Sequence, residues 1–537
     1  MRTLAFLLSG SLFAAFAQNP CDRLKTLSLT DATITALEAI NAGPYTPPAP
    51  ARGGGAPPAA AGAPAAGRGA GRGAAPGGGA AGGPGVPAAA AGRGAAAAPI
   101  MLPAYCRATL TLKPSTDSDI KMEIWMPAAE AWNGKFQMMG NGGWAGSIQG
   151  LNNFPGALRE GYAVSGTDTG HQGGQGEFGL GHPEKFVDFA YRAVHETVLK
   201  SKQLITAYYG KGPKLSYWNG CSTGGRQGLM EASKYPEDFD AVIAGAPANY
   251  QTHLHAWDMN VAVPTLKDEA RFLTVEKETA LNKAVLAACD AMDGVKDGIL
   301  NDPRKCKFDP AALLCKNGDK DDCLTQPQVE SAKLMYSPAK KKNGELIFPG
   351  KEPGSENQWT VVRKAAAPPA LSSGTFQYAT YQDANYDWKN FDLDKDTEAA
   401  DEKFGYVNAS PDLSAFKNRG GKLLMYHGWN DVAISPENSI NQYEAIVKKT
   451  GGKSSDWIKL YMIPGMQHCQ GGPGTDQFNK MAIMERWRES NSAPDVVIAT
   501  HVTGTNVEMT RPLCPYPQVA TYKGVGSPND AGNFSCK

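Results

Sequence analysis

The sequence predicts an α/β protein, a mostly parallel sheet whose strands alternate with helices, interrupted by a second domain. Short apolar runs end in glycine-rich or polar turns, as in "KFQMMGNGG", "YAVSGTD", "KLSYWNG" and "AVIAGAP", and much later in "KLLMYHG" and "IKLYMIPG". Between them lie helical patterns such as "FVDFAYRAVHETVLKSKQLITAYYG", with apolar residues spaced by three and four. Strands that alternate with helices in this way are typical of a parallel sheet.

The alternation breaks over residues 249–410, a stretch rich in aspartate, lysine and aromatic residues with no clear repeat. We expect this stretch to form a domain inserted into the sheet, as a lid. The two parts of the sheet domain are then residues 106–248 and 411–537. A chain of 537 residues is long enough for two or three such units.

The N-terminal region has two predicted parts. Residues 1–17, "MRTLAFLLSGSLFAAFA", place Arg2 before an apolar run that ends in a small-x-small triplet, the form of a signal peptide cleaved after Ala17. An uncleaved anchor is the alternative, but the run is shorter than the roughly 20 apolar residues that span a bilayer. Within residues 18–105, the stretch from Thr46 to Pro99 is almost wholly Ala, Gly and Pro, so we expect it to be disordered. Its few arginines leave a weakly cationic tether to acidic cell-surface polymer as an alternative.

Charge and cysteine content narrow the possible partners. Lysine plus arginine equals aspartate plus glutamate at 53 each, so no bulk field attracts nucleic acid or an anionic membrane. We therefore expect a small-molecule partner, and the composition does not predict an oligomeric state. Ten cysteines in an exported chain predict five disulfides and an oxidising location, secreted or periplasmic.

The strongest catalytic motif is "LSYWNGCSTGGRQGLMEASKYP", a predicted strand, tight turn and helix. Gly220, Ser222 and Gly224 match the G-x-S-x-G nucleophile elbow of the α/β-hydrolase fold, in which a sharp turn presents the serine. A serine that merely caps a helix is the alternative, and the strand before it and the helix after it favour the elbow.

A nucleophilic serine needs a base, and the base needs a carboxylate to orient it. In this fold the acid and then the histidine follow the serine at strand ends. Asp431 follows the strand in "KLLMYHGWNDVAISP", and His468 follows the next strand in "IKLYMIPGMQHCQGG". His427 is a rival base, but its place before Asp431 favours a supporting or substrate-contacting role.

Acyl transfer also needs donors aimed at the developing oxyanion. The amide of Thr223, directly after the nucleophile, is one predicted donor. The second is expected in the glycine-rich loop "MMGNGGWAG", where Gly143 is the first choice and Gly142 the next. An ordinary turn is the alternative for this loop.

Two cysteines flank the predicted catalytic residues, since Cys221 precedes Ser222 and Cys469 follows His468. If the two pair, a disulfide joins the nucleophile turn to the base loop and holds both groups at hydrogen-bonding distance. A free nucleophilic Cys221 is the alternative, which an exported chain with an even cysteine count disfavours.

These motifs, "GCSTGGRQG", "YHGWND", "PGMQHCQGGPGTD" and the terminal "RPLCPYPQVATYKGVGS", resemble the tannase and feruloyl esterase family. They also resemble a bacterial relative that hydrolyses mono(2-hydroxyethyl) terephthalate. The resemblance extends from Cys106 to Cys536. It implies an α/β-hydrolase core, the triad Ser222, Asp431 and His468, and a disulfide between Cys221 and Cys469. The other implied pairs are Cys21–Cys106, Cys289–Cys306, Cys315–Cys323 and Cys514–Cys536.

An acidic loop in the predicted lid, "CDAMDGVKDGILNDPRKC", is a second candidate site. Carboxylates that lie close repel one another unless solvated or neutralised, and glycine turns allow backbone carbonyls to join them around a hard cation. Composition alone leaves a solvated acidic loop equally open. The resemblance implies structural Ca²⁺ here, and no organic cofactor is expected. The implied ligands are the side chains of Asp290, Asp293 and Asp297 with the carbonyls of Val295 and Ile299.

The lid also contains an aromatic run, "TFQYATYQDANYDWKNF". Its rings could stack on an aromatic acyl group, or they could form the small core of the lid itself. The terephthalate-monoester relative holds its substrate with a lid arginine that has no counterpart in this stretch.

The sequence therefore predicts an exported serine esterase, and the resemblance implies esters of aromatic, phenolic acids as substrates. Another aromatic monoester, such as mono(2-hydroxyethyl) terephthalate, is one alternative. A non-catalytic protein that binds phenolics or carbohydrates on the same fold is the other.

Overall fold

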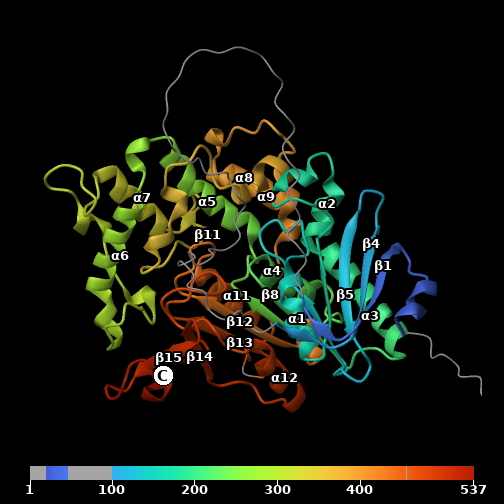
Figure 1. Ribbon diagram of the computed structural model, residues 1–537. Helices are drawn as coiled ribbons and strands as arrows, with labels where there is room; N and C mark the ends of the chain where they lie inside the picture. The colour runs from blue at the N-terminus through green and yellow to red at the C-terminus, as the bar shows by residue number, and fades with distance from the viewer. Residues whose placement is uncertain (1–19, 46–98, 455) are drawn as a thin grey trace, which may run out of the picture.

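The computed structural model describes residues 20–45, 99–454 and 456–537 (Figure 1). The predicted signal peptide lies outside the described residues, and so does the Ala/Gly/Pro stretch apart from Pro99. Within the described ranges, no helix is long and apolar enough to cross a membrane.

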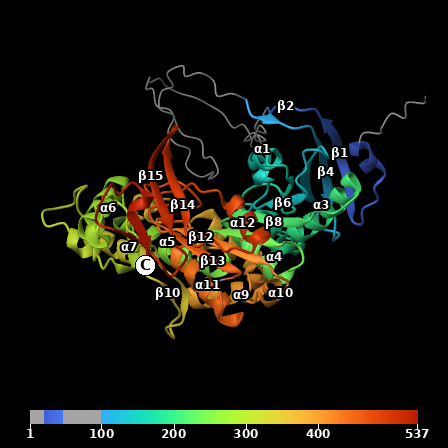
Figure 2. The ribbon, with the colours of Figure 1, turned by 90° about the horizontal axis from the view of Figure 1, so that it is seen from below.

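A nine-stranded sheet forms the centre of the molecule, with β1 as the strand at one edge and the separate pair β14–β15 toward the opposite edge (Figures 1 and 2). Its strands in spatial order are β1 (Ala32–Ile40), β4 (Tyr105–Leu112), β5 (Ile120–Pro127), β7 (Ala163–Thr167), β6 (Lys135–Met139), β8 (Leu215–Cys221), β9 (Ala241–Gly245), β12 (Lys422–Gly428) and β13 (Ile458–Ile463). The shorter pairs are β2 (Gly43–Pro44) with β3 (Met101–Leu102), β10 (Ala339–Lys340) with β11 (Leu346–Phe348), β14 (Val497–Thr503) with β15 (Asn506–Leu513), and β16 (Ala520–Tyr522) with β17 (Phe534–Cys536).

The sheet is antiparallel from β1 to β7 and parallel from β7 to β13. The burial of the strands follows this division. In β4 buried and half-buried residues alternate, whereas every residue of β9 and β12 is buried. Central parallel strands are covered on both faces and read as continuous apolar runs, which explains "AVIAG" and "KLLMY". The predicted α/β class, with a mostly parallel sheet, is confirmed.

Helices cover both faces of the sheet. One hydrophobic cluster contains residues of α3, α4, α10 and α11, and a second on the other face contains residues of α1, α12 and β14. The helices are α1 (Phe154–Arg159), α2 (Pro183–Val187), α3 (Ala193–Tyr209), α4 (Thr223–Lys234), α5 (Gln251–Leu266), α6 (Val275–Cys289), α7 (Gln326–Tyr336), α8 (Ala370–Gly374), α9 (Leu393–Phe404), α10 (Ser414–Asn418), α11 (Pro436–Lys449) and α12 (Lys480–Ser490).

The segment between β9 and β12 is called the lid segment here, and in the view of Figure 1 its helices α5, α8 and α9 lie above the sheet and α6 and α7 lie to the left. Residues of α5, α6, α7, β11 and α9 share a hydrophobic cluster that is separate from the two clusters of the sheet. Ile434, which lies outside this segment in sequence, belongs to the same cluster. The lid segment therefore has a core of its own that is anchored on the loop after β12.

Most of the aromatic run of the lid segment packs inside the lid, and Tyr378 packs instead against a cluster that contains Trp144 and Phe186. Phe376 is fully buried in the lid cluster, and its ring centroid lies 4.9 Å from that of Phe391. Tyr381 and Tyr386 stack with centroids 5.5 Å apart and pack against the same cluster. These contacts favour a structural role for the run over stacking on a substrate.

Candidate active site

Ser222 lies on the turn between β8 and α4, with backbone angles φ 64° and ψ −125°. A positive φ is a costly conformation for a residue with a side chain, and it exposes the serine at the strand end. A Cβ on Gly220 would lie 2.5 Å from the carbonyl oxygen of Gly224, so no larger residue fits there. The structure thus gives the G-x-S-x-G motif its elbow geometry.

Asp431 and His468 follow the neighbouring parallel strands β12 and β13, at the same edge of the sheet as Ser222. The His468 Nδ1 atom lies 2.7 Å from Asp431 Oδ2. The other carboxylate oxygen accepts hydrogen bonds from the amides of Ala433 (2.8 Å) and Ile434 (3.0 Å). Asp431 is fully buried. Its negative charge is nevertheless compensated, because both carboxylate oxygens accept hydrogen bonds.

The electrostatics of this pair suit an acid and a base. Burial alone would raise the pKa of Asp431, but His468 and His427 hold it well below its usual range. Burial would lower the pKa of His468, but the Asp431 carboxylate outweighs this effect and raises it. Asp431 thus stays ionised, and His468 becomes a stronger base than a free imidazole.

His427, the rival base, also contacts Asp431. Its Nε2 atom lies 2.9 Å from Asp431 Oδ2, and its Nδ1 atom lies 2.7 Å from Ser439 Oγ. The side chain of His427 is 0% exposed, whereas that of His468 is 30% exposed. Only His468 of the two can meet a substrate, so the geometry gives His427 a supporting role at the carboxylate.

A disulfide joins Cys221 to Cys469, with the two Cα atoms 6.0 Å apart. It links the residue before Ser222 to the residue after His468 across a sequence separation of 248 residues. Cys469, like Ser222, has a positive φ, of 66°. The four other disulfides that the resemblance implies are also formed, and none of the ten cysteines is free.

The glycine-rich loop after β6 lies beside the nucleophile turn. The Thr223 hydroxyl donates a 2.7 Å hydrogen bond to the Gly143 carbonyl, so the two predicted oxyanion donors are neighbours. The Gly142 amide already donates to the Gln149 side chain. Among the described residues, the Gly143 amide donates to no backbone or side-chain acceptor. The arrangement therefore favours Gly143 over Gly142 as the second donor.

Two amide side chains that sequence analysis missed fix this loop. Asn141 and Gln227 exchange two hydrogen bonds of 3.0 Å, and Asn141 also binds the Thr167 carbonyl at 2.8 Å. The Gly224 amide donates to the Asn141 carbonyl at 2.7 Å. Asn141 lies in "GNGG" and Gln227 in "GRQG". The predictions from these motifs used only their glycines and the neighbouring Ser222 and Thr223.

The acidic loop of the lid segment binds its own backbone. Asp290 accepts from the Gly298 amide at 3.0 Å, and Asp293 accepts from the Val295 amide at 3.0 Å. Burial raises the pKa of Asp293, and the charges of Asp297 and Asp290 raise it further. The three carboxylates are thus close enough to repel one another.

The fit of this loop to calcium is partial. The aspartate oxygens are the hard donors that Ca²⁺ prefers, but Asp297 also forms an ion pair with Arg511. Within the described ranges, the three aspartates do not bring one oxygen each within 4.8 Å of one another. Ca²⁺ at Asp290, Asp293 and Asp297, with the carbonyls of Val295 and Ile299, stays a prediction.

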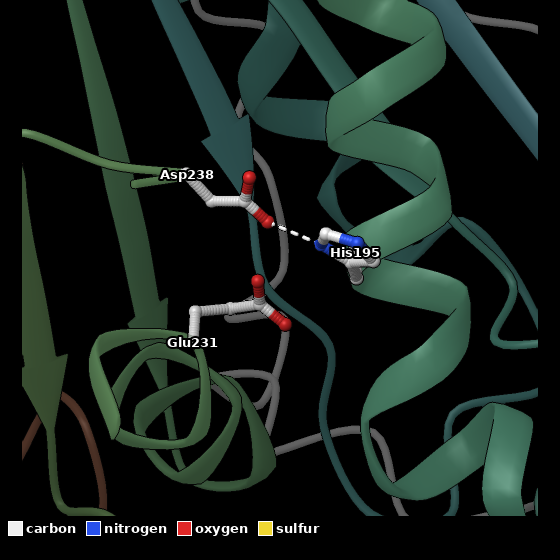
Figure 3. A group of neighbouring side chains, drawn as sticks. All are labelled: His195, Glu231 and Asp238. Atoms are coloured by element: carbon white, nitrogen blue, oxygen red, sulfur yellow. Dashed lines mark hydrogen bonds and ion pairs between the residues drawn. The ribbon is translucent and has the colours of Figure 1, made fainter. Parts of the chain in front are cut away.

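A second cluster of titratable groups lies near the far end of α4 from Ser222, where α3 and the loop before β9 meet it (Figure 3). His195 Nδ1 lies 2.6 Å from Asp238 Oδ2, and Glu231 faces both from α4. Glu231 is 1% exposed, and no described residue donates to either of its carboxyl oxygens. Burial and the charge of Asp238 raise the pKa of Glu231 well above its usual range. Because His195 and Asp238 bind each other directly, the cluster fits a shared proton better than a metal ion.

We expect this carboxyl to make stability depend on pH. A carboxyl whose pKa is raised by folding contributes stability at low pH, and that contribution is lost as pH rises through the folded pKa. As pH rises above the ordinary pKa of a glutamate, the Tm of the wild type should therefore fall more steeply than that of Glu231→Gln, which carries a neutral donor. Calorimetry checks this, with Glu237→Gln, an exposed neighbour, as the control. Parallel curves for wild type and Glu231→Gln would contradict it.

Comparisons with known proteins identify the family of this chain. The family described as "Tannase and feruloyl esterase" matches residues 106–537. An uncharacterized esterase of Xanthomonas campestris is 35% identical, with 81% of this chain and 84% of the relative covered. Probable feruloyl esterase B-1 of Aspergillus flavus is 34% identical, with 80% and 86% covered.

Solved structures agree in fold. The crystal structure of feruloyl esterase B from Aspergillus oryzae superposes with a TM-score of 0.82 at 29% identity, covering 97% of this chain and all of that one. Tannin acyl hydrolase from Aspergillus niger, at 22% identity and a TM-score of 0.69, shares the fold over 82% of this chain and 87% of its own. This chain therefore belongs to the tannase and feruloyl esterase family and is a carboxylic ester hydrolase.

Proposed function

We propose that the chain hydrolyses esters of aromatic, phenolic acids through an acyl-enzyme on Ser222. The observation that carries the proposal is the Asp431–His468 pair, joined by the Cys221–Cys469 disulfide to the elbow that presents the serine. A nucleophile, a base and an orienting carboxylate in this chain order are the parts that the mechanism requires.

In the proposed reaction His468 takes the proton of the Ser222 hydroxyl while Oγ bonds to the ester carbonyl carbon. The amides of Thr223 and Gly143 donate to the oxygen that becomes negative. His468 then gives its proton to the leaving alcohol as the ester bond breaks. In the second half His468 removes a proton from water, which attacks the acyl carbon, and the acid leaves with Ser222 restored. Asp431 holds the imidazole in its orientation throughout.

The choice of acyl group is supported by the relatives. Those named feruloyl esterase and tannin acyl hydrolase act, by their names, on esters of aromatic acids. A terephthalate monoester is the alternative substrate.

A fluorophosphonate probe tests whether the serine is reactive. We expect the wild type to be labelled at Ser222 and Ser222→Ala to remain unlabelled, because the probe bonds only to a serine activated by a base. Mass spectrometry of the labelled peptide identifies the modified residue. Absence of labelling in a folded wild type would contradict the role of Ser222 as the nucleophile.

We also propose that the protein is exported. Five disulfides support this, because disulfides persist in oxidising compartments and are rare in the cytosol. The predicted signal peptide adds a test, since N-terminal analysis of the extracellular or periplasmic protein should find cleavage after Ala17.

We further propose that the acidic loop binds structural Ca²⁺. Removing the ion should expose three mutually repelling carboxylates, so EDTA is expected to lower the Tm by several degrees and added Ca²⁺ to restore it. In Asp293→Asn the effect of EDTA should be smaller. An unchanged Tm, together with protein that holds no calcium by elemental analysis, would contradict the proposal.

A further inference from the structure

Lys351 is a buried cation of the lid segment that the proposed reaction does not use. It follows β11 in "FPGKEPGSE" and is only 3% exposed. Its ammonium donates to the Ala433 carbonyl at 3.2 Å and lies 4.4 Å from the centroid of the Trp257 ring. A buried lysine is costly unless its charge is compensated, so its contacts call for an explanation.

The Ala433 carbonyl connects Lys351 to the catalytic acid. This carbonyl and the Ile434 amide belong to one peptide group. The Ile434 amide donates to Asp431 Oδ1 at 3.0 Å, while the carbonyl accepts from Lys351. A single peptide plane thus stands between the ammonium and the carboxylate, and hydrogen bonds in such a chain polarise one another.

The same turn is also fixed by packing. Ile434 is buried in the lid cluster, and Val432 packs against it. The turn that follows β12 is therefore held from the lid on two sides, by apolar contact and by the Lys351 hydrogen bond. Without the ammonium, the Ala433 carbonyl would lose a buried donor, and the peptide could rotate away from Asp431.

The titratable groups that interact electrostatically with Lys351 are Asp258, Asp431 and His468. Asp258 is held by the Ser372 hydroxyl at 2.6 Å and, with Asp431, opposes the lowering of the Lys351 pKa by burial. Lys351 in turn lowers the pKa of His468. Removal of the Lys351 charge should therefore raise the pKa of His468, in addition to any displacement of Asp431.

We propose that Lys351 is a positioning residue of the esterase, which fixes the turn from Asp431 to Ile434 through the Ala433 carbonyl and so aligns Asp431 with His468. The proposal rests on the proposed function, because it assigns Lys351 a role in the same triad. With this role for Lys351, the lid segment contributes a residue that positions the catalytic acid.

The test compares Lys351→Met and Lys351→Arg with the wild type. Lys351→Met keeps the length of the side chain without donors or charge, and it should lower kcat by about 10- to 100-fold with KM nearly unchanged. The acid limb of its kcat/KM profile should move to higher pH, because a positive charge facing His468 is gone. Lys351→Arg, which retains donors and charge, should recover most of kcat and the original acid limb.

Lys277 supplies the matched control. It is a buried lid lysine, 4% exposed, whose ammonium binds the carbonyls of Lys320 and Cys323 at 2.8 and 2.7 Å. Lys277→Met should lower the Tm and leave kcat and the acid limb of folded protein unchanged. The wild type tests the proposed function separately. A wild type that is inactive and is not labelled by the fluorophosphonate probe would contradict the proposed esterase, whatever the variants of Lys351 do.

The outcomes separate the two claims. An active wild type whose Lys351→Met variant keeps kcat within about twofold and the same acid limb would overturn the role of Lys351 alone. Equal losses in Lys351→Met and Lys277→Met would show a merely structural role. Should Lys351→Met not fold, Lys351→Gln, which lacks the charge, takes its place with the same expected shift of the acid limb.

Discussion

Replacing Asp431 by asparagine is expected to lower kcat by about 10⁴-fold. Asp431 accepts from His468, His427 and two amides, and it is fully buried. An asparagine NH₂ cannot accept from both histidines, so His468 would lose its orientation and its raised pKa. Steady-state kinetics on an activated aryl ester measure the loss.

Asp188→Asn is the control for this result. Asp188 is equally buried and binds Arg192 and Ser118, away from the elbow. Its loss should reduce the Tm and spare kcat. If Asp431→Asn were folded and kept kcat within tenfold of the wild type, Asp431 would not be the catalytic acid.

Removing the Cys221–Cys469 disulfide should damage both stability and catalysis. On the chain-entropy model, a disulfide that closes a loop of 248 residues stabilises the fold by about 5 kcal/mol. The Cys315–Cys323 disulfide closes a loop of 8 residues and stabilises the fold by about 2 to 3 kcal/mol. We therefore expect the serine double variant at Cys221 and Cys469 to show the larger fall in Tm. Because the bridge adjoins both Ser222 and His468, kcat should also fall by about 10- to 100-fold.

The double variant at Cys315 and Cys323 separates the two effects. Its bridge lies in the lid segment, so its kcat should match that of the wild type once both are folded. Equal kcat values for the two double variants would show that the bridge beside the triad stabilises the fold without aligning the catalytic groups.

The sequence was most informative where one local rule decides the outcome. The elbow at Ser222 needs small neighbours at fixed spacing, and the acid and base must follow strand ends, so the three residues could be named from order and pattern. The fully apolar runs of β9 and β12 likewise require a strand covered on both faces.

What could not be predicted depends on contacts between distant segments. Nothing local indicates that β1 adds to the antiparallel edge, or that His427 shares the Asp431 carboxylate. The role of Lys351 depends on a carbonyl 82 residues further along the chain. The acidic loop shows the same limit, because the ion pair of Asp297 with Arg511 competes with a metal in a way that its sequence does not reveal.

The most direct test of the account is hydrolysis of methyl ferulate, methyl gallate and mono(2-hydroxyethyl) terephthalate by the purified mature protein beside Ser222→Ala. We predict turnover of a phenolic ester by the wild type and a loss of at least about 10⁴-fold in Ser222→Ala. Turnover of the terephthalate monoester alone would keep the mechanism and replace the substrate. Equal rates for wild type and Ser222→Ala on every ester would contradict the central claim that Ser222 is the nucleophile.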